Sequence, residues 1–134
     1  MSNPTQNGRF YKRADLNQLK DLRKKNYKPG HEDEANDQYG VRRAEEFDIK
    51  LLAELTKIEG CSAVRVCYGF APETDYTIDI KNGKQMMPRI LLIPIDKEGN
   101  ELSFSVNIAG EKDAGSDFGG VADGIPCPPK GGCE

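Results

Sequence analysis

Apolar side chains recur at helical spacing in two separate stretches of the chain. In residues 14–25 leucines recur every three positions and form a narrow apolar stripe. In residues 41–58 the period is 3.6 residues, and Gly60 offers a stop for the helix. We therefore expect a short helix over 14–25 and a main helix over 41–58. The apolar positions that define them are Leu16, Leu19 and Leu22, and then Phe47, Leu51, Leu55 and Ile58.

Beyond residue 60 apolar and polar residues alternate, which is typical of half-buried strands. Residues 89–95 are instead apolar at nearly every position, as in a central strand. Asn82-Gly83 indicates a turn, and residues 96–100 have the length of a hairpin loop. The alternating positions expected to face a core are Val64, Val66 and Tyr68; Tyr76, Ile78 and Ile80; and Leu102, Phe104, Val106 and Ile108.

These patterns predict an α+β fold, in which a three- to four-stranded antiparallel meander over residues 62–108 packs on the main helix. We expect three segments along the chain. Residues 1–39 would form a basic helical arm and a polar linker, and residues 40–109 the α+β core. Residues 110–134 hold seven glycines and three prolines and show neither period, so we expect an irregular tail rich in Gly, Pro and Cys.

Charge is distributed unevenly along the 134 residues, whose formal net charge is −3. Residues 1–30 contain eight Lys or Arg and two Asp, whereas the remainder is strongly acidic. Such an asymmetry favours an arm that binds an anionic partner or lies on its own acidic body. The residues we expect to contact a partner are Lys20, Arg23, Lys24 and Lys25.

The four cysteines form two pairs with equal spacing, Cys61 with Cys67 and Cys127 with Cys133. A strand over residues 61–67 would separate its two thiols by about 20 Å, too far for one zinc ion. We therefore expect no four-cysteine metal site, and no cofactor for the protein. Cys127 and Cys133 flank two prolines and two glycines, so their sulfurs could meet in a disulfide, in a redox-responsive pair or at a metal ion.

Catalytic signatures are missing from the sequence. His31 is the only histidine and stands beside a run of acids, which is usually a solvated loop. Asp117-Phe118-Gly119 matches the magnesium motif of kinases, but the chain lacks the other kinase motifs and the length. No phosphate-binding or dinucleotide-binding loop is present. We therefore expect a protein that is not an enzyme.

Several stretches resemble small uncharacterised bacterial proteins, of the kind common in Bacteroidota, that end in a CPP…C tail. The resemblance covers about residues 41–134. It rests on EGC at 59–61, VRVCYGF at 64–70, PRILLIPIDKEGNEL at 88–102 and the closing CPP…C. It implies no activity and no functional residue, and it supports treating helix, sheet and tail as one unit.

The functional hypothesis is a small interaction or accessory module that docks a protein partner through its terminal arms. Two alternatives stay open: a thiol-based metal or redox function at Cys127 and Cys133, and nucleic-acid binding through residues 9–28. A short sheet edge at 75–80 also suggests pairing between copies of the chain. The sequence shows no leader peptide and no membrane-spanning run, so we expect a cytoplasmic protein.

Overall fold

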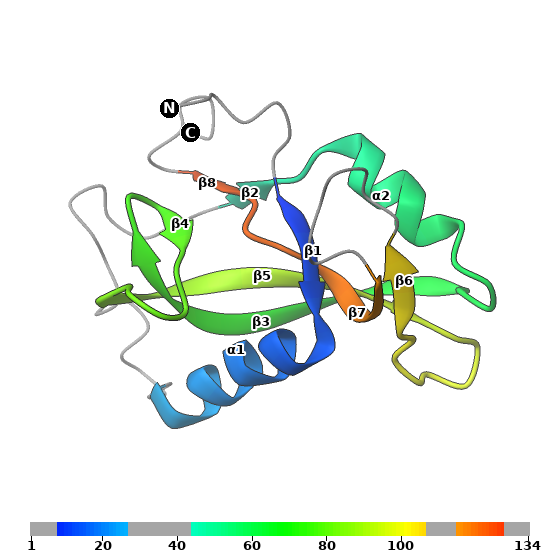
Figure 1. Ribbon diagram of the computed structural model, residues 1–134, viewed down its shortest axis with the longest axis horizontal. Coiled ribbons are helices and arrows are strands. Elements are labelled where there is room, and N and C mark those ends of the chain that lie inside the picture. Colours follow the sequence, from blue (N-terminus) through cyan, green and yellow to red (C-terminus); the bar gives the residue numbers. More distant parts are fainter. Residues whose placement is uncertain (1–7, 27–43, 107–114, 128–134) are drawn as a thin grey trace.

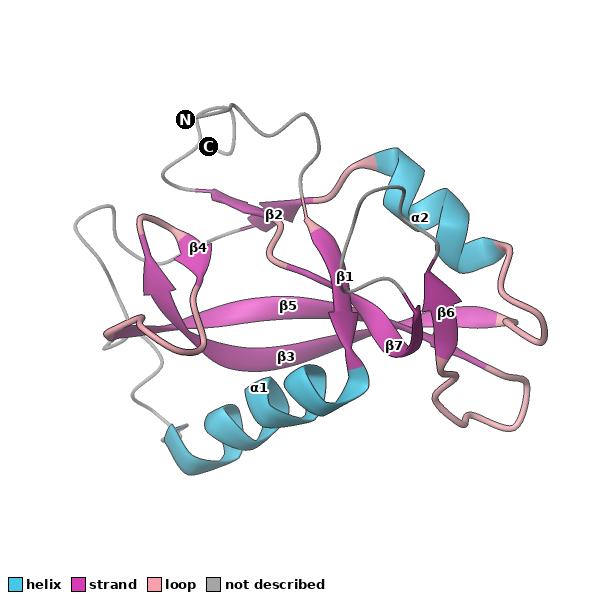
Figure 2. Ribbon diagram, viewed as in Figure 1, coloured by secondary structure: helices cyan, strands magenta, loops and turns pink. Residues whose placement is uncertain are grey.

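The fold is a curled antiparallel sheet with a helix on either side (Figures 1 and 2). The computed structural model describes residues 8–26, 44–106 and 115–127. The elements are β1 (Arg9–Lys12), α1 (Arg13–Asn26), β2 (Ala44–Glu46), α2 (Ile49–Thr56), β3 (Ala63–Thr74), β4 (Thr77–Ile78), β5 (Gln85–Ile95), β6 (Phe104–Val106), β7 (Gly115–Ala122) and β8 (Ile125–Cys127).

Within the described ranges the main sheet has six strands in the order β1-β7-β5-β3-β4, with β6 paired to β7. A second sheet joins β2 to β8. The α+β class and the antiparallel sheet are confirmed, whereas the predicted number of three to four strands is wrong. The sheet takes strands from all three segments into which we expected the chain to divide.

The centre of the sheet is the long hairpin formed by β3 and β5, which pair from Ala63↔Ile95 to Glu73↔Gln85. Strand β5 contains the apolar run predicted to be central, and Leu91, Leu92 and Ile93 are all buried. The predicted loop at 96–100 is confirmed, since the Asp96 N–H donates to the Asn100 carbonyl.

Each helix closes one apolar cluster on its own side of the sheet (Figure 1). Leu16 and Leu19 of α1 are fully buried against Leu91 and other residues of the first cluster. Leu51 and Leu55 of α2 belong to the second cluster, which includes Leu92 and Val121. The leucine stripe predicted for residues 14–25 is confirmed. The expectation of an arm outside the core needs correction, because this helix covers one face of the sheet.

The main helix is shorter than the predicted range 41–58, because residues 44–46 form strand β2 and α2 begins only at Ile49. Asp48 explains the start, since its side chain accepts a hydrogen bond from the Lys50 N–H as an N-cap. The predicted buried positions Leu51 and Leu55 are nevertheless confirmed.

The glycine-rich stretch after residue 110 contains β7 and β8, so the expected irregular tail is wrong for residues 115–127. Strand β7 lies between β1 and β5. A Cβ atom on Gly120 would stand 2.3 Å from the Leu92 carbonyl oxygen, so only glycine permits this approach. Gly120 is therefore required where the backbones of β7 and β5 meet, and the glycines of this stretch do not indicate an irregular tail.

Two other predicted strands are shorter in the structure. The strand expected around Tyr76 to Ile80 becomes the two-residue β4, because Asp75 and Tyr76 adopt positive φ and form a tight turn between Thr74 and Thr77. The strand expected over 102–108 is β6, residues 104–106, and it pairs with β7. Residues 107 and 108 lie outside the described part of the chain.

The predicted inward face of β3 is wrong near its middle. Val66 and Tyr68 are 53% and 63% exposed, while Cys67 packs against the cluster under α1. The eight residues of α2 cover only part of the opposite face, where Val64 packs against the second cluster.

A buried arginine links the two sheets. The Arg89 side chain is fully buried and bonds Glu73 at 2.7 Å, Glu45 at 3.2 Å and Asp123 at 3.5 Å. It also donates to the carbonyl oxygens of Tyr76 and Gly124. Burial would lower the pKa of Arg89, but the three carboxylates outweigh it and raise that pKa, so the guanidinium stays charged. The guanidinium ties β5 to residues of β2 and β3 and of the turn between β7 and β8.

Candidate functional site

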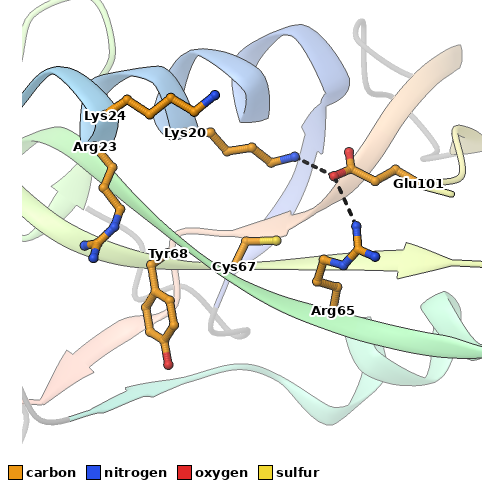
Figure 3. Close-up of a pocket in the computed structure, with 7 residues that line it drawn as sticks. All are labelled: Lys20, Arg23, Lys24, Arg65, Cys67, Tyr68 and Glu101. Carbon is orange, nitrogen blue, oxygen red and sulfur yellow. Dashed lines mark hydrogen bonds and ion pairs between the residues drawn. The ribbon is translucent and has the colours of Figure 1, made fainter. Parts of the chain in front are cut away.

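A groove of about 480 Å³ runs between α1 and the outer edge of β3 (Figure 3). Four of its seven lining residues are cationic and one is acidic, a net charge of +3. The lining residues are Lys20, Arg23, Lys24, Arg65, Cys67, Tyr68 and Glu101.

Helix α1 places three cations on the groove because positions 20, 23 and 24 are three and four residues apart and share one helix face. The helix can lie close to β3 because Gly69 has no side chain. A Cβ atom there would stand 3.1 Å from the Leu19 carbonyl oxygen. The leucine stripe and this glycine together set the width of the groove.

Glu101 closes one end of the groove and organises its cations. Its carboxylate bonds the Lys20 ammonium at 2.6 Å, lies 3.9 Å from the Arg65 guanidinium, and also bonds Arg13. Burial would raise the pKa of Glu101, but the hydrogen bond and charge of Lys20 and the nearby arginines outweigh it and lower that pKa. The carboxylate therefore stays ionised and holds Lys20 at the groove.

An arginine–aromatic contact bounds the other end (Figure 3). The Arg23 guanidinium lies 5.7 Å from the centre of the Tyr68 ring and 5.8 Å from that of Phe70. Such contacts are cation–π interactions. Tyr68 remains largely exposed, so it offers a partner apolar surface beside the cations.

Cys67 lies between these two ends, on the face of β3 that looks toward α1. Burial raises the pKa of the Cys67 thiol, with Lys20 opposing this effect. The thiol is therefore protonated at neutral pH and has low nucleophilicity. We therefore assign Cys67 no catalytic role. Its slow alkylation can instead report whether the groove is occupied.

Three of the four residues predicted to contact a partner, Lys20, Arg23 and Lys24, line the groove. Lys25 is exposed in the last turn of α1 and is not among the lining residues. Sequence reasoning missed Arg65 and Glu101, which come from β3 and from the segment after β5. No local pattern marks them, because only the tertiary fold brings them to α1.

The thiol prediction for Cys127 and Cys133 is outside what the structure describes, apart from the backbone of Cys127 at the end of β8. His31 is also outside the described residues. Within the described ranges, no three His, Cys, Asp or Glu side chains are grouped to hold a metal ion. In the same part of the chain, neither helix has the length and apolarity needed to cross a membrane.

Comparison with known proteins returned no matching family model, no matching curated protein and no matching solved structure. The resemblance to small bacterial proteins with a CPP…C tail therefore stays a prediction.

Proposed function

We propose that this chain is a non-enzymatic binding module that docks an acidic segment of a protein partner in the groove between α1 and β3. The observation that carries the proposal is the convergence of cations from two elements on one groove. That groove has a net charge of +3, although the whole chain has a net charge of −3. Such a local field attracts an anionic partner and orients it before contact.

Two features of the groove favour an acidic protein over a nucleic acid. Glu101 places a carboxylate among the cations, and a nucleic acid, which carries a phosphate at every nucleotide, cannot leave that point uncharged as a peptide can. Arg23 already lies over the Tyr68 ring, where a nucleic-acid base would otherwise stack. A protein segment can match this mixture, because it can place acidic and apolar side chains at separate positions.

The test compares two probes of equal charge by fluorescence anisotropy. The first is a labelled nine-residue peptide amide of alternating glutamate and valine, EVEVEVEVE, with five carboxylates. The second is labelled hexathymidylate, with five phosphates. We expect the peptide to bind more tightly and its affinity to fall as salt rises. Tighter binding of hexathymidylate would replace the proposal with nucleic-acid binding, and binding of neither probe would overturn it.

Adjacent lysines of α1 provide a matched pair of variants. Lys24→Glu and Lys25→Glu change the net charge equally in the same helical turn, but only Lys24 lines the groove. We expect Lys24→Glu to weaken peptide binding by at least about fivefold and Lys25→Glu by less than about twofold, given the usual strength of exposed ion pairs. Equal losses would show that only overall charge matters, and would remove the groove from the proposal.

Occupancy of the groove is also measurable directly. Cys67 lies in the groove, so bound peptide should slow its alkylation by iodoacetamide. Peptide mapping by mass spectrometry follows Cys67 separately from Cys61, which precedes β3 and does not line the groove. Protection of both cysteines, or of neither, would place the peptide elsewhere on the molecule.

A further inference from the structure

The outer edge of β3 is open where it borders the groove. On its inner side β3 pairs with β5 along its whole length. On its outer side, β4 is the one described strand that pairs with it, at Glu73 and Thr74. Residues 63–68 are exposed or half-buried and present a strand edge with which no strand in the described ranges pairs, whereas Gly69 and Phe70 are buried. An open edge carries main-chain N–H and C=O groups that can hydrogen-bond a further strand.

The two sides of this edge differ in chemistry, because successive side chains of a strand point to opposite faces. Arg65 and Cys67 point to the α1 side, where Lys20 and Lys24 also lie (Figure 3). Val66 and Tyr68 start from the other face and are more than half exposed, and the Tyr68 ring also borders the groove, where Arg23 of α1 reaches it. A strand laid along this edge would meet cations on one face and apolar side chains on the other.

We propose that the partner segment binds as an added β-strand along residues 63–68 of β3, with acidic side chains alternating with apolar ones. This inference rests on the proposed function and adds its geometry and its sequence requirement. The acidic positions would face Lys20, Lys24 and Arg65, and the apolar positions would pack beside Val66 and Tyr68. Main-chain hydrogen bonds would supply affinity, and the alternation would supply specificity.

A second copy of this chain fits the edge less well than an acidic segment. Pairing β3 with β3 of another copy would bring two grooves of net charge +3 together. Like charges facing each other across an interface oppose association. The matching occupant is therefore a segment that carries negative charge at every second position.

The first experiment compares peptides of one composition in two orders. EVEVEVEVE can place all its glutamates on one face of a strand, whereas EEEEEVVVV cannot. We expect the alternating peptide to bind at least about tenfold more tightly to the full chain, because only it satisfies both faces. Equal binding of the two orders, or tighter binding of the block order, would overturn strand addition. The proposed function would survive either result, since an acidic peptide would still occupy the groove.

The second experiment removes peptide N–H groups. In an added strand, alternate N–H groups point toward β3 and the others point away. One peptide therefore carries N-methyl groups on its valines, and another carries them on its internal glutamates. We expect one series to lose at least about tenfold in affinity and the other to retain most of it, since several hydrogen bonds are lost together. Equal effects in the two series would refute strand addition.

Controls separate this inference from the proposed function. Lys24→Glu should weaken the alternating peptide, and Lys25→Glu should not, whatever the backbone geometry. Sedimentation of the free chain checks the competing occupant. Self-association together with failure of the alternating peptide to bind would assign the edge to a second copy and overturn the inference.

Discussion

Replacing Arg89 by methionine should destabilise the fold by about 3–5 kcal/mol, the cost usually seen when one partner of a buried ion pair is removed. The side chain is fully buried, and three carboxylates contact it at 2.7–3.5 Å. Methionine fills much of the same volume but offers no charge and no donor. The variant would therefore leave Glu45, Glu73 and Asp123 buried without their shared cation.

The size of this loss in stability follows from the ion-pair attraction that the folded variant no longer has. A contact ion pair near 4 Å is worth about 4 kcal/mol in gross attraction at an effective dielectric of 20. Much of that attraction offsets the free-energy cost of burying the charges. Without the arginine the carboxylates are still buried, and nothing offsets the cost of their burial. Small domains are stable by about 5–15 kcal/mol. The variant should therefore keep only a small free energy of unfolding, and its melting temperature should fall by about 12–20 °C.

The defect should shrink as pH falls. Even beside Arg89, burial raises the pKa of Asp123, while the Ile78 N–H and the arginine oppose that effect. Without the arginine, the pKa of Asp123 should rise further in the folded state. A raised carboxyl pKa means that the folded state binds the proton more tightly than the unfolded chain. Lowering the pH from 7 toward about 4 therefore favours the folded variant relative to the wild type.

Urea unfolding at pH 7 and pH 5 measures both effects. A double variant, Arg89→Met with Glu73→Gln, removes the charge of the nearest carboxylate and should recover part of the loss. Arg89→Lys keeps the charge without the planar fork and should fall between the wild type and Arg89→Met. A loss under about 1 kcal/mol at pH 7, or a loss that grows as pH falls, would refute the role assigned to this cluster.

Three further predictions follow from other positions. Gly120→Ala should cost about 3 kcal/mol or more in urea unfolding, because the new Cβ atom would stand 2.3 Å from the Leu92 carbonyl oxygen. Glu101→Gln should tighten binding of the EVEVEVEVE peptide, because Lys20 would lose its anionic partner; unchanged or weaker binding would contradict this. Burial raises the pKa of Tyr11 to about 12, so absorbance at 295 nm should show a late tyrosine ionisation, and Tyr11→Phe should abolish that step. Since the unfolded chain would release this proton near pH 10, the fold should lose stability between pH 10 and 12.

Parts of the fold governed by local apolar spacing were predictable from the sequence. The leucine stripe placed α1 to within one residue at each end, because helix period and burial agree there. The apolar run inside β5 likewise identified the central strand. In both, the side chains that define the pattern are those that fill the core.

Other parts depend on contacts that no local pattern records. Strand β7 contains Gly119 and Gly120, so it lacks apolar alternation although it pairs beside β5. Val66 and Tyr68 are exposed despite their apolar character, because α2 is too short to cover them. Which strand residues are buried therefore depends on where each helix begins and ends. Caps determine these limits, as Asp48 does for the start of α2.

The candidate site was predictable only on its helical side. A basic cluster at helical spacing indicated Lys20, Arg23 and Lys24. Arg65 and Glu101 join them from positions more than forty and seventy residues away in the chain. Such convergence comes from the antiparallel pairing of β3 and β5, which places the start of β3 beside the end of β5. The segment after β5 then lies at the start of α1, where Glu101 bonds Arg13.

The pairing of β1 with β7 has a consequence for the order in which the strands are synthesised and fold. Arg9 lies opposite Ala122 in the antiparallel register, so the partner of β1 is made more than a hundred residues later. At synthesis rates of about 5–20 residues per second, translation reaches that partner roughly 6–23 s after β1. The hairpin of β3 and β5 closes over a much shorter stretch of chain and does not need β7. Arg9–Lys12 is thus synthesised well before its partner strand and can join the sheet only when β7 becomes available.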